Sequence, residues 1–421
     1  MRDGNMKKSK NHPKKSQKSK IRSHASPKTA QNIFHTEEKE KAKIMLANSL
    51  VGEFKFIFIL LRLMAINVRE PIITSWRDVS NRIFKTFGAS ILKLLVFIIF
   101  GVKMSIQTFY LIFAEDKTNE FTISFQSVLK MMAYISTYRK RREMFRMTKH
   151  LNQLFQVLPC KTLREQKYVF VMYLILSLCF LISWTLRVYF IDTNKIKMEN
   201  YFLKKNSTTE SRDLPSSIFI WSIEASELLF YLITRVIISL FSTYYIFTCR
   251  LIRVLLQRLL DEIHNTKKPE ILQKYLELHE EIMKSFCNFD THFSFLAFIL
   301  VTLCMINLFR AGYALAFFIK KQDMEFYALI CALIFYLSVQ IILMISGIKT
   351  NESAKNVRNN IQNLLKKLRK NSAEISKLDA DLRPAPTLSL WKMYEFDRSL
   401  ITASVGTVLT YGILLGTLGK N

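Results

Sequence analysis

Charged, amide and aromatic side chains stand inside several long apolar runs of this chain, and they are the residues most able to do chemistry. Each such group is costly in lipid, so it must face protein or water. Glu224 shares a helix face with Arg235, whereas Asn307, Arg310 and Tyr313 recur at intervals of three residues. The candidate ligand-binding residues are Gln107, Trp184, Arg187, Glu224, Glu227, Asn307, Arg310 and Tyr313.

Two interpretations of these side chains stay open. Acidic, basic and aromatic groups at a similar depth would line a cavity open to the outside, and that chemistry suits a small polar or amphipathic ligand. Alternatively, Arg187 and Arg310 would form ion pairs with the glutamates of the run around 218–247 and only hold the helices together.

Other kinds of site are not indicated by the sequence. There is no glycine-rich phosphate loop, HExxH or GxSxG pattern, so we predict neither an enzyme nor a cofactor. The six cysteines show no metal-ligand spacing and no disulfide framework, so no metal site is predicted. His292 stands near the start of an apolar run and is interpreted as an interface residue rather than a ligand.

The elements that must position these side chains follow from composition and charge. Half of the 421 residues are apolar, with 33 phenylalanines, and they gather into runs of about twenty residues, which is the length of a membrane-spanning helix. The net charge of +28 falls in the stretches between the runs. This pattern favours a multi-spanning membrane protein in the lipid bilayer over a nucleic-acid-binding protein.

The apolar runs predict an all-α fold with seven transmembrane helices. The spans are expected at about 87–113, 121–138, 168–190, 218–247, 293–319, 326–348 and 400–421. The first six would form a bundle over residues 87–348 that holds the ligand cavity. Residues 1–45 read as a disordered basic cytoplasmic tail, and 46–86 as an interfacial or re-entrant helical segment.

Basic residues fix the expected orientation. They concentrate between spans two and three, four and five, and six and seven, which the positive-inside rule places in the cytoplasm. The N-terminus is then cytoplasmic and the C-terminus extracellular, and Asn206 lies in an external loop as a glycosylation candidate. Helical apolar spacing in 249–289 and 353–378 predicts that the spans continue inward, with 349–399 forming cytoplasmic anchor helices.

The last apolar run is unusual because it is rich in Gly, Ser and Thr. Residues 396–400 read FDRSL, and Gly406 and the pair Thr410-Tyr411 follow close to the C-terminus. This arrangement resembles the closing signature of the insect and arthropod gustatory receptors. The Thr-Tyr half of that signature matches, whereas its Gln-Phe half is replaced by Thr417-Leu418. The chain is therefore similar to a divergent member of that family.

The resemblance implies a ligand-gated, non-selective cation channel that opens on binding a small-molecule tastant. It implies a homo- or heterotetramer with other receptor subunits, in which the last helices line one pore. It also implies a multi-pass protein of the plasma membrane, in the dendrite of a sensory neuron. By motif position, Leu414 falls near an apolar gate, Thr417 stands where the family's pore-facing Gln would be, and Leu418 stands where its Phe would be. The pore and gate candidates are Thr407, Thr410, Tyr411, Leu414, Thr417 and Leu418.

Two other functions remain as alternatives. A seven-helix G-protein-coupled receptor would need an extracellular N-terminus, which the basic tail opposes. A secondary transporter would more often show related halves with broken helices, and none is evident in the sequence.

Overall fold

The structure is a computed structural model of the chain. It describes residues 54, 57–59, 61, 77–113, 117–158, 215–265, 269–317, 324–369 and 386–418. The described part is almost entirely helical. Its elements are α2 (Arg77–Phe113), α3 (Lys117–Val157), α6 (Pro215–Asn265), α7 (Pro269–Phe317), α8 (Met324–Arg369), β1 (Ser389–Leu390), β2 (Tyr394–Glu395) and α10 (Arg398–Leu418).

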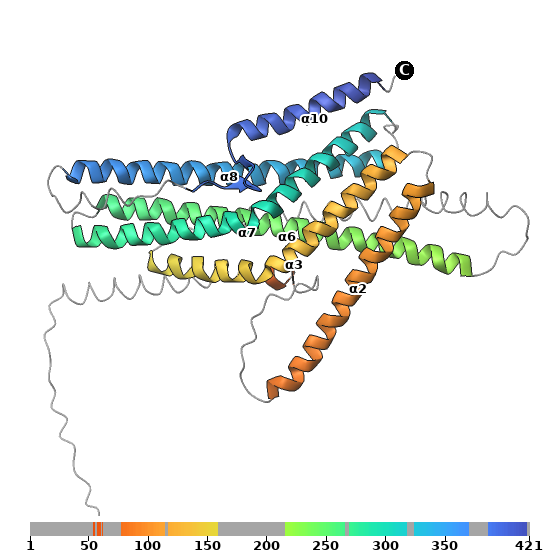
Figure 1. Ribbon diagram of the computed structural model, residues 1–421, viewed down its shortest axis with the longest axis horizontal. Coiled ribbons are helices and arrows are strands. Elements are labelled where there is room, and N and C mark those ends of the chain that lie inside the picture. The colour runs from red at the N-terminus through yellow and green to blue at the C-terminus, as the bar shows by residue number, and fades with distance from the viewer. Residues whose placement is uncertain are drawn as a thin grey trace, which may run out of the picture.

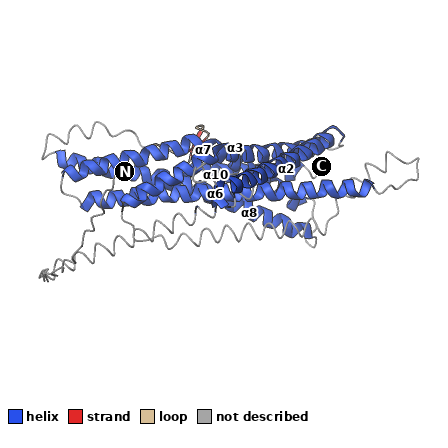
Figure 2. Cartoon of the chain, turned by 90° about the horizontal axis from the view of Figure 1, so that it is seen from below, coloured by secondary structure: helices blue, strands red, loops and turns tan. Residues whose placement is uncertain are grey.

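The long helices α6, α7 and α8 each join an apolar half to a charged half without a break. They pack side by side along the long axis of the molecule, with α3 against α7 and α2 against α3 and α6 (Figures 1 and 2). Both α6 and α7 begin at proline, whose fixed φ and missing N–H suit the first helical position. The predicted inward extensions of spans four, five and six are therefore continuous with those spans.

The centre of the molecule is an aromatic core around the middle of α6. Tyr244 and Tyr245 are fully buried there, as are Phe289 and Phe293 of α7. The ring centroids of Tyr245 and Phe289 lie 5.0 Å apart, and those of Tyr244 and Phe293 lie 5.6 Å apart. Buried aromatic pairs at this spacing stabilise by about 0.5–1.5 kcal/mol beyond their burial, so this core fixes α6 against α7.

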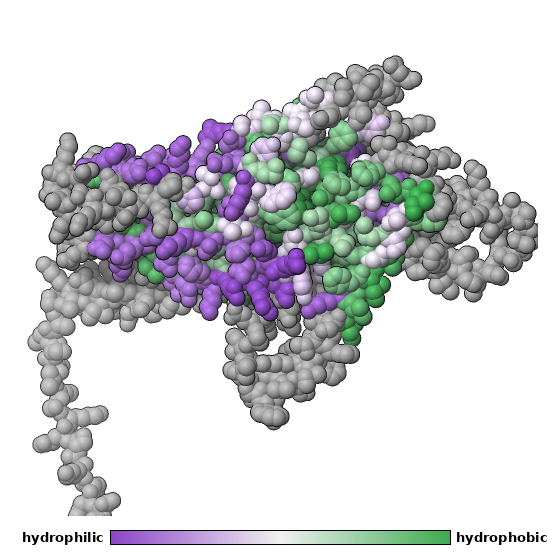
Figure 3. Space-filling view, in the orientation of Figure 1, coloured by the Kyte–Doolittle hydropathy of each residue, from purple (hydrophilic) through white to green (hydrophobic). Residues whose placement is uncertain are grey.

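The surface divides into a hydrophilic part and an apolar part along the molecule (Figure 3). Within the described residues, three helices are long and apolar enough to cross a membrane: Ala225–Asn265, Ile271–Leu315 and Leu329–Lys366. Leu94 and Phe97 of α2 are more than half exposed, as is Ile112. Such large exposed apolar side chains are typical of a surface that contacts lipid or another chain. Seven spans and the orientation of the termini stay predictions.

The N-terminal part of the chain differs in detail from the sequence expectation. The helix that contains the first predicted span begins at Arg77, ten residues before that span. The second predicted span lies in α3, which continues through the basic stretch to Val157. In the segment predicted as interfacial or re-entrant, Phe54 and Ile57 are buried in the same core as Tyr244. The third predicted span lies outside the described residues.

A short β-hairpin precedes the last helix, within the segment predicted to hold anchor helices. Its strands pair antiparallel, with Ser389 opposite Glu395 and Leu390 opposite Tyr394. Trp391 and Lys392 form the turn with φ angles of 51° and 57°. The N–H of Met393 donates to the carbonyl of Leu390 at 3.0 Å, so the two residues with positive φ are the central residues of a type I′ turn, and Met393 is an extra residue before the paired position Tyr394. Next to the hairpin, α10 leaves the side of α8 and projects away from the bundle (Figure 1).

Candidate functional site

A buried ion pair joins α2 to α6 in the apolar part of the bundle. The ammonium group of Lys103 contacts Oε1 of Glu227, and the two side chains are 5% and 16% exposed. Charges in an apolar interior persist only when they are paired or solvated. This pair therefore links α2 to α6 at one depth of the bundle.

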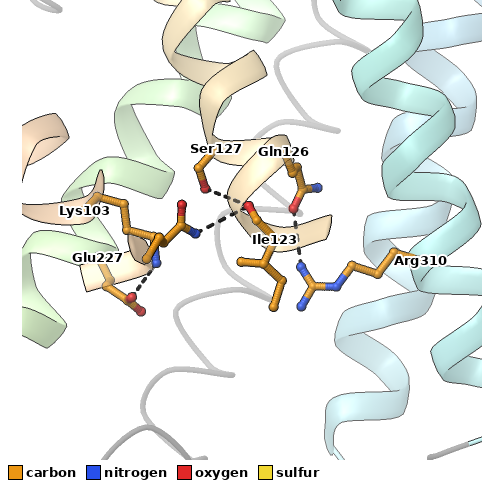
Figure 4. A network of polar contacts seen from close by, with 7 residues as sticks. Lys103, Ile123, Gln126, Ser127, Glu227 and Arg310 are labelled. Carbon is orange, nitrogen blue, oxygen red and sulfur yellow. Dashed lines mark hydrogen bonds and ion pairs between the residues drawn. The ribbon is translucent and has the colours of Figure 1, made fainter. Parts of the chain in front are cut away.

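A chain of amide contacts joins α3 to α7 beside this ion pair. Nε2 of Gln126 donates to Oδ1 of Asn307, and Nη1 of Arg310 donates to Oε1 of Gln126 at 3.3 Å. Asn307 also donates from Nδ2 to the carbonyl of Leu303 at 2.6 Å. Figure 4 shows Lys103 and Glu227 on one side of α3, and Gln126 meeting Arg310 on the other.

Two further cations lie against aromatic rings in the same region. Nζ of Lys130 on α3 is 4.6 Å from the ring centroid of Tyr231, and Lys130 is only 2% exposed. The guanidinium of Arg235 lies 4.2 Å from the ring centroid of Tyr336 on α8. Cation–π contacts stabilise a desolvated cation by about 2 kcal/mol or more. All of these groups together form one polar cluster between α2, α3, α6, α7 and α8, which we call the interhelical cluster.

The interhelical cluster contains part of the predicted ligand-binding set. Glu227, Asn307 and Arg310 belong to it, and Gln107 lies close by, donating from Nε2 to the carbonyl of Ile123 at 3.4 Å. The ring of Tyr313 stacks on Phe309, with centroids 6.4 Å apart. Glu224 lies on α6, but its side chain is outside the described residues. Trp184, Arg187 and Asn206 also lie outside them.

Several members of the cluster were not selected from the sequence. Lys103 and Lys130 interrupt apolar runs, and Gln126 stands in the second predicted span. The signal that could have found all three is the one used for the glutamates, because a lysine or glutamine in an apolar run must also meet protein or water. Glu227 forms an ion pair with Lys103, whereas the ion-pair interpretation of the sequence pairs the glutamates with Arg187 or Arg310.

A second polar site, the hairpin joint, fastens the start of α10 to α7 and α8. Asn351 of α8 donates from Nδ2 to the carbonyls of Leu388 and Phe396 at 3.1 and 3.0 Å, and its Oδ1 accepts from the Leu388 N–H at 2.7 Å. Asp290 of α7 accepts from the backbone N–H of Ser389 at 2.6 Å and from its hydroxyl at 3.0 Å. One amide and one carboxylate thus hold both strands of the hairpin.

Each residue of the FDRSL motif has a role at this joint. Phe396 is 2% exposed and packs against Gly347 of α8 and the ring of Tyr245. Nε of Arg398 donates to Oε1 of Glu352 at 2.9 Å. Ser399 donates from its hydroxyl to Oδ1 of Asp397 at 2.7 Å. Leu400 packs against the main core as a partly buried residue.

The remaining residues of α10 extend beyond the joint. Ser404 is buried and its hydroxyl lies 3.8 Å from Sδ of Met344. Thr407 and Thr410 are exposed, and Thr407 donates from Oγ1 to the carbonyl of Ala403 at 2.8 Å. The helical positions of Tyr411, Leu414, Thr417 and Leu418 are described, but their side chains are not.

We expect Asp397→Ala to fray the start of α10. Oδ1 of Asp397 accepts from the N–H of Leu400 at 2.9 Å, which is a helix N-cap, and replacing such a cap by alanine costs about 0.5–2 kcal/mol. Hydrogen exchange of the first-turn amides of α10 measures the loss. The hydrogen bonds from Ser399 and Leu400 lower the pKa of the Asp397 carboxyl. The charge-dependent stabilisation is therefore full above the ordinary pKa and is lost as the pH falls through the lowered one.

Asp397→Asn is the control for this prediction. Asparagine caps helices about as well as aspartate, so the protection factors of these amides should stay close to those of the wild type at neutral pH and should not fall with the wild type's at acidic pH. Equal fraying in both variants would show that the start of α10 is not held by this cap.

The chain matches a known protein family and is similar in fold to known structures. Residues 81–415 match the family model described as 7tm Chemosensory receptor. The structure of the insect olfactory receptor OR5 from Machilis hrabei in complex with eugenol is similar, with a TM-score of 0.65 and 15% identity over 89% of this chain and 100% of that one. A second structure of the same receptor gives a TM-score of 0.59 and 15% identity over 88% and 98%. No curated protein matches the chain.

Proposed function

Because the chain belongs to the 7tm chemosensory receptor family, we propose that it is a gustatory receptor that acts as a ligand-gated, non-selective cation channel. The family is one of receptors rather than of enzymes. The observation that carries the proposal is the hairpin joint, which connects the C-terminal helix α10, rich in small residues, to α7 and α8. Both of these helices also contribute residues to the interhelical cluster. A change at the cluster would reach α10 through α7 and α8.

The interhelical cluster is the proposed ligand site. Cations, amides and aromatic rings converge there from different helices, which is the chemistry of a pocket for a small polar or amphipathic molecule. Glu227, Asn307 and Arg310 are its described members from the predicted set, with Gln107 beside them. A ligand that binds one arrangement of these helices better than another would shift the population toward it.

The proposed pore is lined by α10 of several subunits. Val405 and Leu409 of α10 are 39% and 60% exposed, and Thr407 and Thr410 are exposed beside them. A helix with such a surface needs either lipid or further chains around it, and small and hydroxyl-bearing residues suit close packing and a wet path. A homo- or heterotetramer would place four such helices around one axis, with Leu414 at an apolar gate that closes by dewetting.

The proposed setting is the plasma membrane of a sensory neuron, in the dendrite. In it the N-terminus is cytoplasmic, the charged halves of α6, α7 and α8 lie below the membrane, and the C-terminus is extracellular. Asn206 would then be exposed to glycosylation. Attachment of antibody to an epitope on the basic tail of intact cells would contradict this orientation and favour a G-protein-coupled receptor.

We also propose that the compound that opens the channel is a tastant. The solved structures that share this fold are of an olfactory receptor, so a volatile compound is the alternative to a tastant. The test is to express the chain alone, record current during application of a panel of both kinds of compound, and replace external sodium by a large organic cation. A ligand-evoked inward current that persists when potassium or caesium replaces external sodium, and disappears with the large organic cation, supports the proposal. Stoichiometric uptake of the ligand without such current would support a transporter.

We expect Leu414→Ala to raise the current in the absence of ligand. A smaller side chain at a dewetting gate widens it, and a modest widening allows water and ions to enter. Val405→Ala, at an exposed apolar position nearer the start of α10, is the matched control and should leave the basal current low. Unchanged basal and evoked currents in Leu414→Ala would show that the gate lies elsewhere.

A further inference from the structure

A groove between α6 and α8 is lined by residues that belong to neither the proposed ligand site nor the proposed pore. It encloses a cavity of about 170 Å³. Its walls combine basic side chains with apolar ones and one hydroxyl. The residues that form it include Arg250, Arg253, Ile342, Ile345, Ser346 and Lys349.

The groove lies where both helices change from apolar to charged. On α6 no charged residue occurs from 236 to 249, and Arg250 follows directly. On α8 none occurs from 326 to 348, and Lys349 follows directly. Figure 3 shows the hydrophobic and hydrophilic parts of the surface meeting partway along the molecule. In a membrane protein such a boundary coincides with the level of the lipid headgroups.

The charges of the groove are all of one sign. Three basic residues line it, and no carboxylate does. Glu352 lies one turn beyond Lys349 on α8, but it accepts a hydrogen bond from Arg398 at 2.9 Å. Nε of Arg253 is buried and has no hydrogen-bond partner among the described residues. A guanidinium N–H held in that state lacks an acceptor oxygen. Carboxylate and phosphate oxygens match the guanidinium best, and because no carboxylate lines the groove, a phosphate from outside the chain is the fitting acceptor.

We propose that this groove binds a phospholipid with a negatively charged headgroup, from the leaflet that borders the charged halves of the helices. The headgroup phosphate contacts Arg253 and is flanked by Arg250 and Lys349. An acyl chain runs along the apolar wall formed by Ile342 and Ile345, of which Ile345 is 37% exposed and open to the membrane. The lipid would thereby hold α6 against α8 just below their apolar halves.

The site is tested first on the unmodified full-length chain. The protein is reconstituted in nanodiscs of phosphatidylcholine that contain a small fraction of a photoactivatable phosphatidylinositol bisphosphate, irradiated, and digested. We expect labelled peptides from 246–253 and 342–349. Labelling confined to other segments, or crosslinks in this groove to a second copy of the chain, would overturn the proposal. Soluble inositol phosphate should compete more weakly than the lipid, because it has no acyl chain for the apolar wall. Equal competition by the two would show that the acyl chain is not recognised and would also overturn the proposal.

Variants with matched charge provide the second measurement. Arg253→Gln/Lys349→Gln removes two cations from the groove, whereas Lys355→Gln/Lys366→Gln removes two exposed cations from α8 outside it. Each basic residue near an anionic lipid surface contributes about fivefold to binding, so the groove variant should retain roughly 25-fold less of the lipid than wild type. Lipid counts after detergent extraction are read by native mass spectrometry. Equal loss in both pairs would mean general attraction to the membrane rather than a site, and would contradict the proposal.

Discussion

Glu227→Leu is expected to remove most of the folded receptor from the cell surface. Glu227 forms the ion pair with Lys103 of α2, whose side chain is only 5% exposed. Removing one partner of a buried ion pair leaves the other charge uncompensated, which costs about 3–5 kcal/mol. This is a large part of the roughly 5–15 kcal/mol by which proteins are stable. Surface labelling of intact cells and the melting temperature in detergent should both fall.

The double variant Lys103→Met/Glu227→Leu separates pairing from other roles of the charges. Apolar side chains of similar volume in place of a buried ion pair are often neutral or stabilising, so the surface level should recover. Glu280→Leu is the matched control, because its pair with Lys284 is exposed and exposed pairs contribute about 0–1 kcal/mol. A double variant that reaches the surface but no longer responds to ligand would assign the pair to the ligand site. Failure of the double variant to recover would contradict a role limited to pairing.

The long helices could be predicted from the sequence because the apolar runs and the helical spacing that indicate them are local patterns. The uncharged run of α8 ends at Lys349, and Val357, Ile361 and Leu365 then recur on one face, so the helix is predicted to continue inward. In the structure α8 extends without a break to Arg369, whereas its inward direction stays a prediction. The FDRSL motif similarly marked the approach to the last helix, and the matched family model spans residues 81–415.

The contacts between helices could not be obtained in the same way. The position of a residue along a span gives its depth, but it does not give the rotation of the helix or the identity of its neighbours. In the ion-pair interpretation of the sequence Arg310 meets a glutamate, whereas in the structure it donates to Gln126 of α3 at 3.3 Å. Glu227 forms an ion pair with Lys103, a residue that was not among the candidate site residues predicted from the sequence.

The hairpin before α10 was also not predicted, for a physical reason. Its strands have two residues each, and its turn is formed by Trp391 and Lys392 instead of the Asn-Gly or Gly-containing pairs that identify such turns. The turn is stabilised by tertiary contacts. The N–H of Trp391 donates to the carbonyl of Ser294 at 3.2 Å, and its ring lies 5.2 Å from that of Phe295. Contacts of this kind are invisible until α7 is placed beside the segment.

The second large effect is expected at Gly347, where α8 meets the hairpin joint. A Cβ atom there would lie 2.6 and 2.8 Å from the ring carbons Cγ and Cδ1 of Phe396. Glycine in a helix is normally less stable than alanine by about 0.5–1 kcal/mol, so Gly→Ala should stabilise a helix where there is space. At Gly347 we expect the opposite, because the buried ring must move and overpacking costs about 1–3 kcal/mol. The melting temperature should fall, and ligand-evoked current should fall further, since the ring seats the start of α10.

Gly406→Ala and Gly312→Ala are the matched controls for Gly347→Ala. A Cβ at either position meets nothing within 4 Å, so neither variant should lower the melting temperature. Gly347→Ala/Phe396→Leu tests the cause directly, because a smaller, more flexible side chain gives space to the added methyl group. If the clash is responsible, the double variant should be more stable than Gly347→Ala, although Phe396→Leu alone is destabilising. Additive losses in the double variant would show that the two residues do not act on each other, and that Phe396 does not link α8 to α10.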